Sequence, residues 1–417
     1  MQIFDSSQSR GDSLCVLCRG AKLLCGKRSC PVLVKYYASE KIMPLIDGFE
    51  LNGASPPGVF VGRMGYPKVN IGPLISPLHG ETSYLDLPEL WGDKSMEDIV
   101  SFRFQLVRGK YRVNAIEPNR GGRILDLTRE LALCKNSAEV EASFVKKPLG
   151  RIALDDEVQP YGPSAPLLSM ELGTLKTDRD IEKAHYDFDL KAGDAALVLY
   201  GKGAFVTKIQ RAFSVGCFGV EKNRRLVPTR WSITAVDDVI SKSLVEEIKD
   251  YPTIDEYRVY ESWRLDNRFA VIMAPFSWSY ELVEAWYPNT VWNPTGKKIV
   301  IYASHEGYHG RSKYADIGGC YYAARLAVGE ALRKEGKQAC VVILREAHPG
   351  YIMPVGVWNV RENVRNAMRQ TPLKFESLKE VFKYVSMRLE IPGERWITKS
   401  EILKRVLYQR RLEDYLK

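Results

Sequence analysis

Apolar runs rich in β-branched residues recur along the second half of the chain. The runs at 232–239, 269–275, 298–303 and 339–344 are short and apolar, as buried strands are, and we predict a strand at each. The stretch 319–335 lies between the last two runs and predicts a helix. A strand, a helix and a strand in succession predict an α+β or α/β body with a mixed sheet.

The first half of the chain mixes glycine- and proline-rich segments with helical patterns. Residues 52–80 predict short strands and loops, because glycine and proline recur throughout and exclude long helices. Residues 95–110 predict a helix that Ser95 caps, and 123–147 predict a second helix. A proline-rich connection follows, and it predicts a hinge or a sub-domain border near 158–167.

The chain turns helical after residue 361, where charged and apolar residues alternate at helical spacing. These patterns divide the chain into four expected parts. We predict a small N-terminal module at 1–35, an α/β body at 36–370, C-terminal helices at 371–407 and a tail at 408–417.

Positive charge gathers at both ends of the 417-residue chain, whose net charge is +9. Residues 1–35 hold six Lys or Arg against two Asp, and residues 395–417 hold seven against three acids. Basic patches suit contact with phosphate backbones, and a solvated surface that serves solubility is the alternative. No run of 18 apolar residues and no apolar leader occurs, so we expect a cytoplasmic protein without membrane contact.

Four of the eight cysteines lie within one short N-terminal window, with the spacing C-x2-C-x6-C-x4-C. Four thiolates this close can surround one Zn²⁺ ion tetrahedrally, so Cys15, Cys18, Cys25 and Cys30 predict a zinc module with four cysteine ligands. Two disulfides, or free cysteines, are the alternatives. The cations between the cysteines can face DNA; they are Arg19, Lys22, Lys27 and Arg28.

The segment 222–238 concentrates guanidinium, hydroxyl and carboxylate groups. Arg224, Arg225 and Arg230 suit phosphate binding, and Asp237 and Asp238 could hold Mg²⁺ or act as general bases. Arg224, Arg230, Asp237 and Asp238 are therefore catalytic candidates. The alternative is that Arg230 pairs with a buried acid and that the two aspartates cap a helix.

A second candidate for anion binding is the pair Gly318 and Gly319, which stands at the start of the predicted helix 319–335. Bare backbone amides at a helix start point outward and can bind phosphate. The alternative is that the glycines only permit close helix packing.

The extreme C-terminus carries Gln409, Leu412, Tyr415 and Leu416, which share one face of a tight helical turn. An amide, an aliphatic side chain and an aromatic ring on one face suit docking into a groove of another protein. The pattern resembles the peptide Q-x-x-Φ-x-x-aromatic-aromatic that binds the replication sliding clamp PCNA, although Leu416 replaces the last aromatic. The alternative is a helix end that packs on its own core.

Over essentially its whole length the chain resembles the archaeal Nre family of DNA repair proteins. The resemblance rests on the cysteine cluster, on the segments RRLVPTRWSITAVDD, GGCYYAARLAV and REAHPGYIMPVGVWNVRENVR, and on the clamp-binding-like tail. It implies an archaeal, nucleoid-associated repair protein with a zinc finger and recruitment through PCNA. It implies no catalytic residues.

Three functional hypotheses follow. The first is a repair protein that is recruited to PCNA by its tail and grips DNA through a basic zinc module. The second is a repair enzyme that acts on a nucleotide or phosphodiester at the 222–238 cluster. The third is a non-catalytic protein adaptor. Salt-dependent DNA affinity would separate the first from the third.

Overall fold

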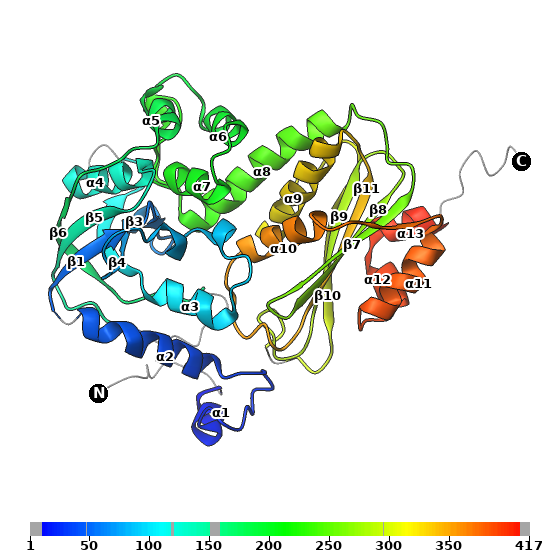
Figure 1. Ribbon diagram of the computed structural model, residues 1–417, viewed down its shortest axis with the longest axis horizontal. Helices are drawn as coiled ribbons and strands as arrows, with labels where there is room; N and C mark the ends of the chain where they lie inside the picture. Colours follow the sequence, from blue (N-terminus) through cyan, green and yellow to red (C-terminus); the bar gives the residue numbers. More distant parts are fainter. Residues whose placement is uncertain (1–10, 47, 118–120, 151–158, 295, 409–417) are drawn as a thin grey trace, which may run out of the picture. The chain divides into compact units, whose positions relative to one another are not determined.

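The computed structural model describes residues 11–46, 48–117, 121–150, 159–294 and 296–408. The chain forms two compact units, each built on a six-stranded mixed sheet (Figure 1). The first unit takes in the chain up to residue 24, residues 29–240 and 353–355; the second takes in 25–28, 241–352 and the chain from 356. The predicted α+β class with mixed sheets is confirmed.

The first unit has the strand order β1-β5-β6-β4-β3-β2. Strands β4 and β6 run parallel, and the other neighbours are antiparallel. Its elements are α1 (Gly11–Cys18), α2 (Pro31–Ile42), η1 (Met43–Ile46), β1 (Glu50–Ser55), β2 (Val59–Val61), β3 (Lys68–Ile75), η2 (Ser83–Leu85), η3 (Pro88–Leu90), α3 (Met96–Phe104), β4 (Val107–Asn114), α4 (Gly122–Leu133), β5 (Ala138–Phe144), β6 (Ser164–Leu172), α5 (Arg179–Tyr186), α6 (Ala192–Gly201), α7 (Val206–Ser214) and η5 (Glu221–Asn223).

The second unit has the strand order β10-β9-β11-β8-β7-β12, in which β9 and β11 run parallel. Helix α8 (Thr229–Ile248) contains the boundary between the units, at residues 240 and 241. The remaining elements are β7 (Tyr257–Arg264), β8 (Asn267–Ala274), β9 (Ser279–Trp286), β10 (Val300–Glu306), α9 (Gly319–Glu335), β11 (Cys340–Ala347), α10 (Trp358–Met368), β12 (Leu373–Phe375), α11 (Leu378–Arg388), α12 (Gly393–Lys399) and α13 (Glu401–Tyr408).

Helices cover both faces of the second sheet, as Figure 1 shows. Val341 and Ile343 of β11 pack in one core with residues of α8, α9 and α10, whereas Val342 and Leu344 pack in the other core with residues of α11, α12 and α13. Every residue of β9 and of β11 is therefore buried. This burial explains why the apolar run at 339–344 is continuous instead of alternating.

The sequence predicted several elements correctly and misassigned others. Helix α9 begins and ends where the pattern predicted, and Ser95 caps α3 through reciprocal hydrogen bonds with Asp98. The predicted helix 95–110 ends at Phe104 and continues as β4, and the predicted helix 123–147 ends at Leu133 and is followed by β5.

The predicted strand at 232–239 is wrong, because these residues belong to helix α8. Its β-branched residues suggested a strand. Buried Val236, Ile240 and Leu244 instead recur every four residues, which is the spacing of one helix face. The units divide within this helix, and residues 164–172, which overlap the expected border near 158–167, form β6 of the first sheet.

Buried ion pairs link the layers of the second unit. The guanidinium of Arg325 on α9 lies 2.6 Å from the Glu306 carboxylate on β10, and both side chains are almost fully buried. Glu306 also accepts a hydrogen bond from the indole of Trp278. Arg345 of β11 pairs in the same way with Glu284, its register partner on β9, and donates to the Asn267 side chain. Each of these buried charges thus has a partner.

Replacing Arg325 by Met should destabilise the second unit strongly. The change leaves the Glu306 carboxylate buried without its cation, which costs about 3–5 kcal/mol of unfolding free energy. Denaturant titration followed by circular dichroism measures this loss. The matched control is Lys404→Met, which removes an exposed pair with Glu401 and should cost less than about 1 kcal/mol. Equal losses for the two variants would contradict the structural role of the buried pair.

Candidate nucleic-acid interface

The hairpin of β2 and β3 in the first unit presents an aromatic side chain beside a helix start. The rings of Tyr66, in the hairpin loop, and Trp231, in the first turn of α8, lie 5.3 Å apart between centroids. Tyr66 is 43% exposed and Trp231 is 47% exposed, so both rings keep solvent-facing surface. Exposed aromatic faces are the platforms on which unpaired bases stack.

Backbone and hydroxyl hydrogen bonds fix Trp231 next to the hairpin. The amide of Val61 in β2 donates to the Thr229 hydroxyl over 2.8 Å, at the start of α8. The amide of Leu226 donates to the carbonyl of Ala115, the residue that follows β4. The segment 226–231 is therefore held against β2 and the end of β4.

Exposed cations lie on the same elements as this aromatic pair and on the strand beside them. Arg112 extends from β4 to the hairpin loop, where its guanidinium packs against Gly65 so closely that a Cβ at that position would lie 2.6 Å from it. Gly65 also has a φ of +78°, a conformation that favours glycine. The exposed cations here are Arg63, Lys68, Arg112, Arg225 and Arg230, and none forms an ion pair with another described residue. Unpaired cations beside exposed rings suit a nucleic-acid strand.

The catalytic candidates of segment 222–238 have different environments. Arg224 donates from Nε to the carbonyl of Gly219 and from Nη2 to the carbonyl of His185, so it holds a loop together. Asp237 is fully buried in α8 and accepts a hydrogen bond from Gln210 over 2.8 Å, and Asp238, the next residue, is half-buried. The segment therefore presents Arg225 and Arg230 to solvent, and its carboxylates do not form an open acidic site.

Gly318 and Gly319 stand at the start of α9, as the sequence predicted. Gly318 is the N-cap, with a φ of +68° that favours glycine, and it receives no side-chain cap. Both glycines are half-buried. The Sγ of the next residue, Cys320, lies 3.9 Å from Arg345 Nη1, within the buried network of the second unit.

The four N-terminal cysteines form no disulfide with another described residue. Among the described residues, no group of three or more His, Cys, Asp or Glu side chains is arranged to hold a metal ion. The chemistry around Cys18 nevertheless suits a metal ligand. Backbone amides of Leu24, Gly20, Lys22 and Leu23 donate to its sulfur and lower the pKa of the thiol, which favours the thiolate.

The basic residues between these cysteines fall into two groups. Arg19 and Lys22 are exposed. Lys27 is buried and donates from Nζ to the Ile352 carbonyl over 3.0 Å, and Arg28 pairs with Asp266 over 2.9 Å. Lys27 and Arg28 thus anchor the loop 25–28 within the second unit, although Arg28 stays exposed, and Arg19 and Lys22 are exposed without an ion pair to a described residue.

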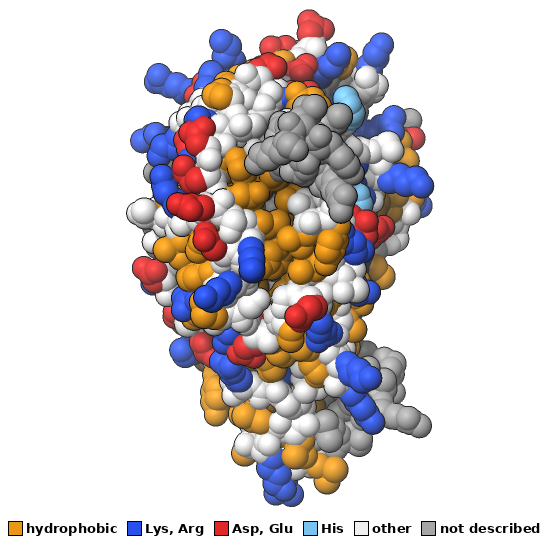
Figure 2. Space-filling model, turned by 90° about the vertical axis from the view of Figure 1, so that its right-hand side faces the viewer, with side chains coloured by type: hydrophobic (Ala, Val, Ile, Leu, Met, Phe, Trp, Pro, Cys, Tyr) orange, Lys and Arg blue, Asp and Glu red, His pale blue; other side chains and the backbone are white. Residues whose placement is uncertain are grey.

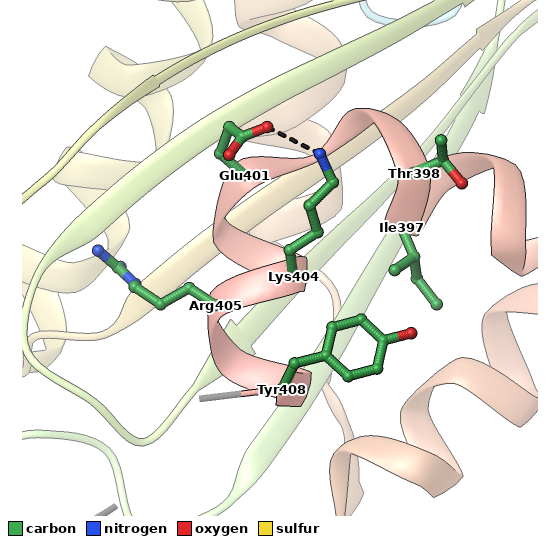
Figure 3. A pocket seen from close by; sticks show the side chains of 6 residues that line it. All are labelled: Ile397, Thr398, Glu401, Lys404, Arg405 and Tyr408. Atoms are coloured by element: carbon green, nitrogen blue, oxygen red, sulfur yellow. Dashed lines mark hydrogen bonds and ion pairs between the residues drawn. The ribbon is translucent and has the colours of Figure 1, made fainter. Parts of the chain in front are cut away.

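Helices α12 and α13 border an open pocket of about 650 Å³ in the second unit. Figure 3 shows the Lys404 ammonium turned to the Glu401 carboxylate, 2.8 Å away, at its edge. On one face of the molecule apolar side chains gather between flanking charges (Figure 2). Helices α11 and α13 carry exposed apolar side chains, Met387 and Tyr408. The pocket itself is lined by Ile397, Thr398, Glu401, Lys404, Arg405 and Tyr408.

A buried carboxylate fixes the start of α13. Glu281 of β9 is fully buried and accepts hydrogen bonds from the amides of Glu401 and Ile402 and from the Ser400 hydroxyl. A carboxylate at a helix N-terminus satisfies amides that otherwise lack partners. The predicted docking residues Gln409, Leu412, Tyr415 and Leu416 follow this helix and lie outside the described residues.

The sequence did not lead us to predict Arg63, Tyr66, Lys68 or Arg112 as site residues. A signal was present for the first three, because a tyrosine and two cations fall in or directly after a glycine-containing turn. The pairing of β3 with β4, which brings Arg112 to the hairpin, is a long-range contact that the sequence alone did not reveal. Among the described residues, no helix is long and apolar enough to cross a bilayer.

Two family models match the chain. The model for the N-terminal region of archaeal Nre matches residues 24–293, and the model for its C-terminal region matches residues 306–415. No solved structure is significantly similar.

Curated relatives are similar over most of their length. The chain is 40% identical over 392 residues to the DNA repair protein NreB of Archaeoglobus fulgidus, covering 94% of this chain and 97% of the relative. It is 38% identical to the DNA repair protein NreA of that organism, covering 90% and 94%. It is 34% identical to the DNA repair protein NreA of Haloferax volcanii, covering 82% and 85%. The two matching family models and the identity to these relatives show that the chain belongs to the archaeal Nre family.

Proposed function

We propose that this protein acts in DNA repair and binds a DNA strand on the surface formed by the β2–β3 hairpin, the end of β4 and the start of α8. The name "DNA repair protein" that its relatives carry supports the role. The observation that carries the proposal is the exposed Tyr66–Trp231 pair among five exposed cations without ion-pair partners in the described chain. Rings of this kind stack on bases, and the cations neutralise phosphates.

Replacing Trp231 by Ala should weaken binding of a single-stranded oligonucleotide about tenfold or more, because one stacked base contributes about 1–3 kcal/mol. Fluorescence anisotropy measures the affinity. The matched control is Trp263→Ala. Trp263 is 48% exposed, but the guanidiniums of its neighbours Arg268 and Arg388 pair with Glu390 and Glu261. Equal affinities of both variants and the wild type would exclude the Trp231 surface as the DNA site.

The double variant Arg112→Gln, Arg230→Gln should lower the salt dependence of the same binding. Each lost phosphate contact reduces the slope of log affinity against log salt by about 0.7 for a single strand. The slope is measured between low and physiological salt. An unchanged slope with weaker binding would show that these arginines do not contact phosphate. A wild-type protein without any DNA affinity would favour the adaptor hypothesis.

A Zn²⁺ ion held by Cys15, Cys18, Cys25 and Cys30 is the second part of the proposal. The support is the spacing of the four thiols and the set of amides that stabilise the Cys18 thiolate. A bound zinc ion would supply folding energy to a module too short for a core of its own. Arg19 and Lys22, exposed in this loop, would then add to the DNA contact.

Metal analysis of the purified protein should find one zinc per chain, and Cys18→Ser should lower this content. The control is Cys340→Ala. Cys340 is buried in the second unit, where burial raises the pKa of its thiol and so disfavours the thiolate that zinc binding requires. Protein purified without chelators that contains no zinc would refute the zinc module.

The third part of the proposal is recruitment to PCNA through Gln409, Leu412, Tyr415 and Leu416. It rests on the residue pattern, together with the anchoring of α13, which leads directly to this tail. Replacing Gln409, Leu412 and Tyr415 by Ala should abolish binding to the clamp in calorimetry without changing the thermal midpoint. The control, Arg410→Gln with Arg411→Gln, alters the opposite face and should keep most of the affinity. Retained binding by the triple variant would exclude the tail.

A further inference from the structure

Two arginines of the first unit bind a single buried carboxylate, and a third arginine lies beside them. Asp86 follows η2 and is 2% exposed. Arg211 of α7 binds it through two hydrogen bonds, from Nε to Oδ2 over 3.0 Å and from Nη2 to Oδ1 over 2.9 Å. Arg103 of α3 also donates to Oδ1. Arg108 of β4 packs on the ring of Tyr161, whose neighbour Gly162 lies against the Arg103 carbonyl. We call Asp86 and the three arginines the Asp86 cluster.

The charges of the Asp86 cluster do not balance. Among these four residues, three guanidiniums stand against one carboxylate, which gives the cluster a net charge of +2. Glu89 in η3 is not part of the cluster, and its Oε1 accepts a hydrogen bond from the Thr207 amide. Arg108 forms no ion pair with any described residue, and the buried Nε of Arg103 has no hydrogen-bond partner. Buried surplus charge of this kind costs stability unless an anion compensates it.

Aromatic rings hold Arg108 without supplying an acceptor. Its guanidinium lies 4.1 Å from the centroid of the Tyr161 ring and 5.4 Å from that of Phe60. Rings pack on the faces of a guanidinium and leave the N–H groups at its edge free to donate. Burial is the main cause that lowers the pKa of Arg108 to about 10, and the neighbouring Arg103 and Arg211 lower it further. An oxyanion at that edge would raise the pKa of Arg108 again.

Close backbone contacts fix the rim of the cluster. Gly162 is packed so tightly that a Cβ there would lie 2.6 Å from the Phe104 carbonyl oxygen, and this contact sets the adjacent Tyr161 against β4. A Cβ at Gly58 would lie 2.8 Å from Oδ2 of Asp86, so the loop before β2 closes over the carboxylate. The arrangement is therefore built by contacts from separate elements, and Arg108 keeps a half-buried, solvent-reaching position.

We propose that Arg103, Arg108 and Arg211 bind a phosphate group, with Asp86 orienting two of the three guanidiniums. Guanidinium groups match the geometry of phosphate oxygens and donate paired hydrogen bonds to them. Lys110 and Arg112 follow Arg108 on the same face of β4, which connects the site to the basic surface around Trp231. A phosphate at the end of a DNA strand and the phosphate of a free nucleotide share this chemistry.

The first test uses inorganic phosphate and the full-length protein. Titration calorimetry should detect binding to the wild type, and Arg108→Met should weaken it about tenfold or more, because a charge-assisted donor is lost. Arg108→Lys keeps the charge and should recover part of the affinity. Arg179→Met, at an exposed arginine of α5, is the control and should bind as the wild type does. Absence of phosphate binding by the folded wild type would overturn the proposal.

The thermal midpoint protects the test against misfolding. Arg108→Met removes a guanidinium that forms no ion pair with a described residue, so the variant should keep the wild-type midpoint without phosphate, and phosphate should raise the midpoint of the wild type more than that of the variant. A wild-type midpoint that phosphate leaves unchanged would show that the cluster serves only the structure, and would also overturn the proposal.

Oligonucleotides identify the source of the phosphate. If the site takes a strand end, a 5′-phosphorylated oligonucleotide should bind more tightly than its 5′-hydroxyl counterpart, and Arg108→Met should abolish this difference. If it takes a nucleotide, deoxyadenosine monophosphate should bind at least as well as inorganic phosphate while the two oligonucleotides bind equally. Trp231→Ala should leave phosphate binding unchanged, so failure of the proposed DNA surface and failure of this site give different results.

Discussion

A guanidinium that is buried away from water needs a hydrogen-bond acceptor, and this requirement constrains the structure of both units. In the second unit the buried arginines of the core have carboxylates of their own, as Arg325 has Glu306 and Arg345 has Glu284. Such pairs contribute little net stability compared with apolar side chains, yet breaking one is costly, so they fix which strand lies beside which. The first unit breaks the pattern at Asp86, where two arginines share one acid and Arg108 beside them forms no ion pair with a described residue.

This difference distinguishes buried charges that serve the fold from buried charges that can bind a ligand. Around Arg345 each buried cation has a carboxylate partner, so packing of the unit accounts for the network without a ligand. Where cations exceed acids, the protein bears an electrostatic cost that folding alone does not require, and binding of an anion is the physical reason to retain it. On one face of strand β4, the half-buried Arg108 is followed by Lys110 and then by the exposed Arg112.

The sequence revealed features that depend on neighbours along the chain. Helix α9 and strand β11 were predicted because their apolar residues are continuous or periodic over short windows. The stretch 232–239 was misassigned because its β-branched residues favour a strand locally, whereas packing of Val236 and Ile240 selects a helix. The Asp86 cluster was out of reach, since Asp86 and Arg211 are 125 residues apart and neither stands in a recognisable motif. The zinc module and the docking tail stay predictions, and each rests on a residue pattern confined to a short segment.

The capping of α13 by Glu281 has a mechanical consequence. Helix ends usually unwind first under load, because their terminal amides are weakly held. Here the first amides of the last described helix are bonded to a carboxylate in a central strand of the sheet. Under load the start of α13 would thus stay attached to the sheet, and unwinding would be confined to its later turns, because opening the start would leave the buried Glu281 carboxylate without its donors.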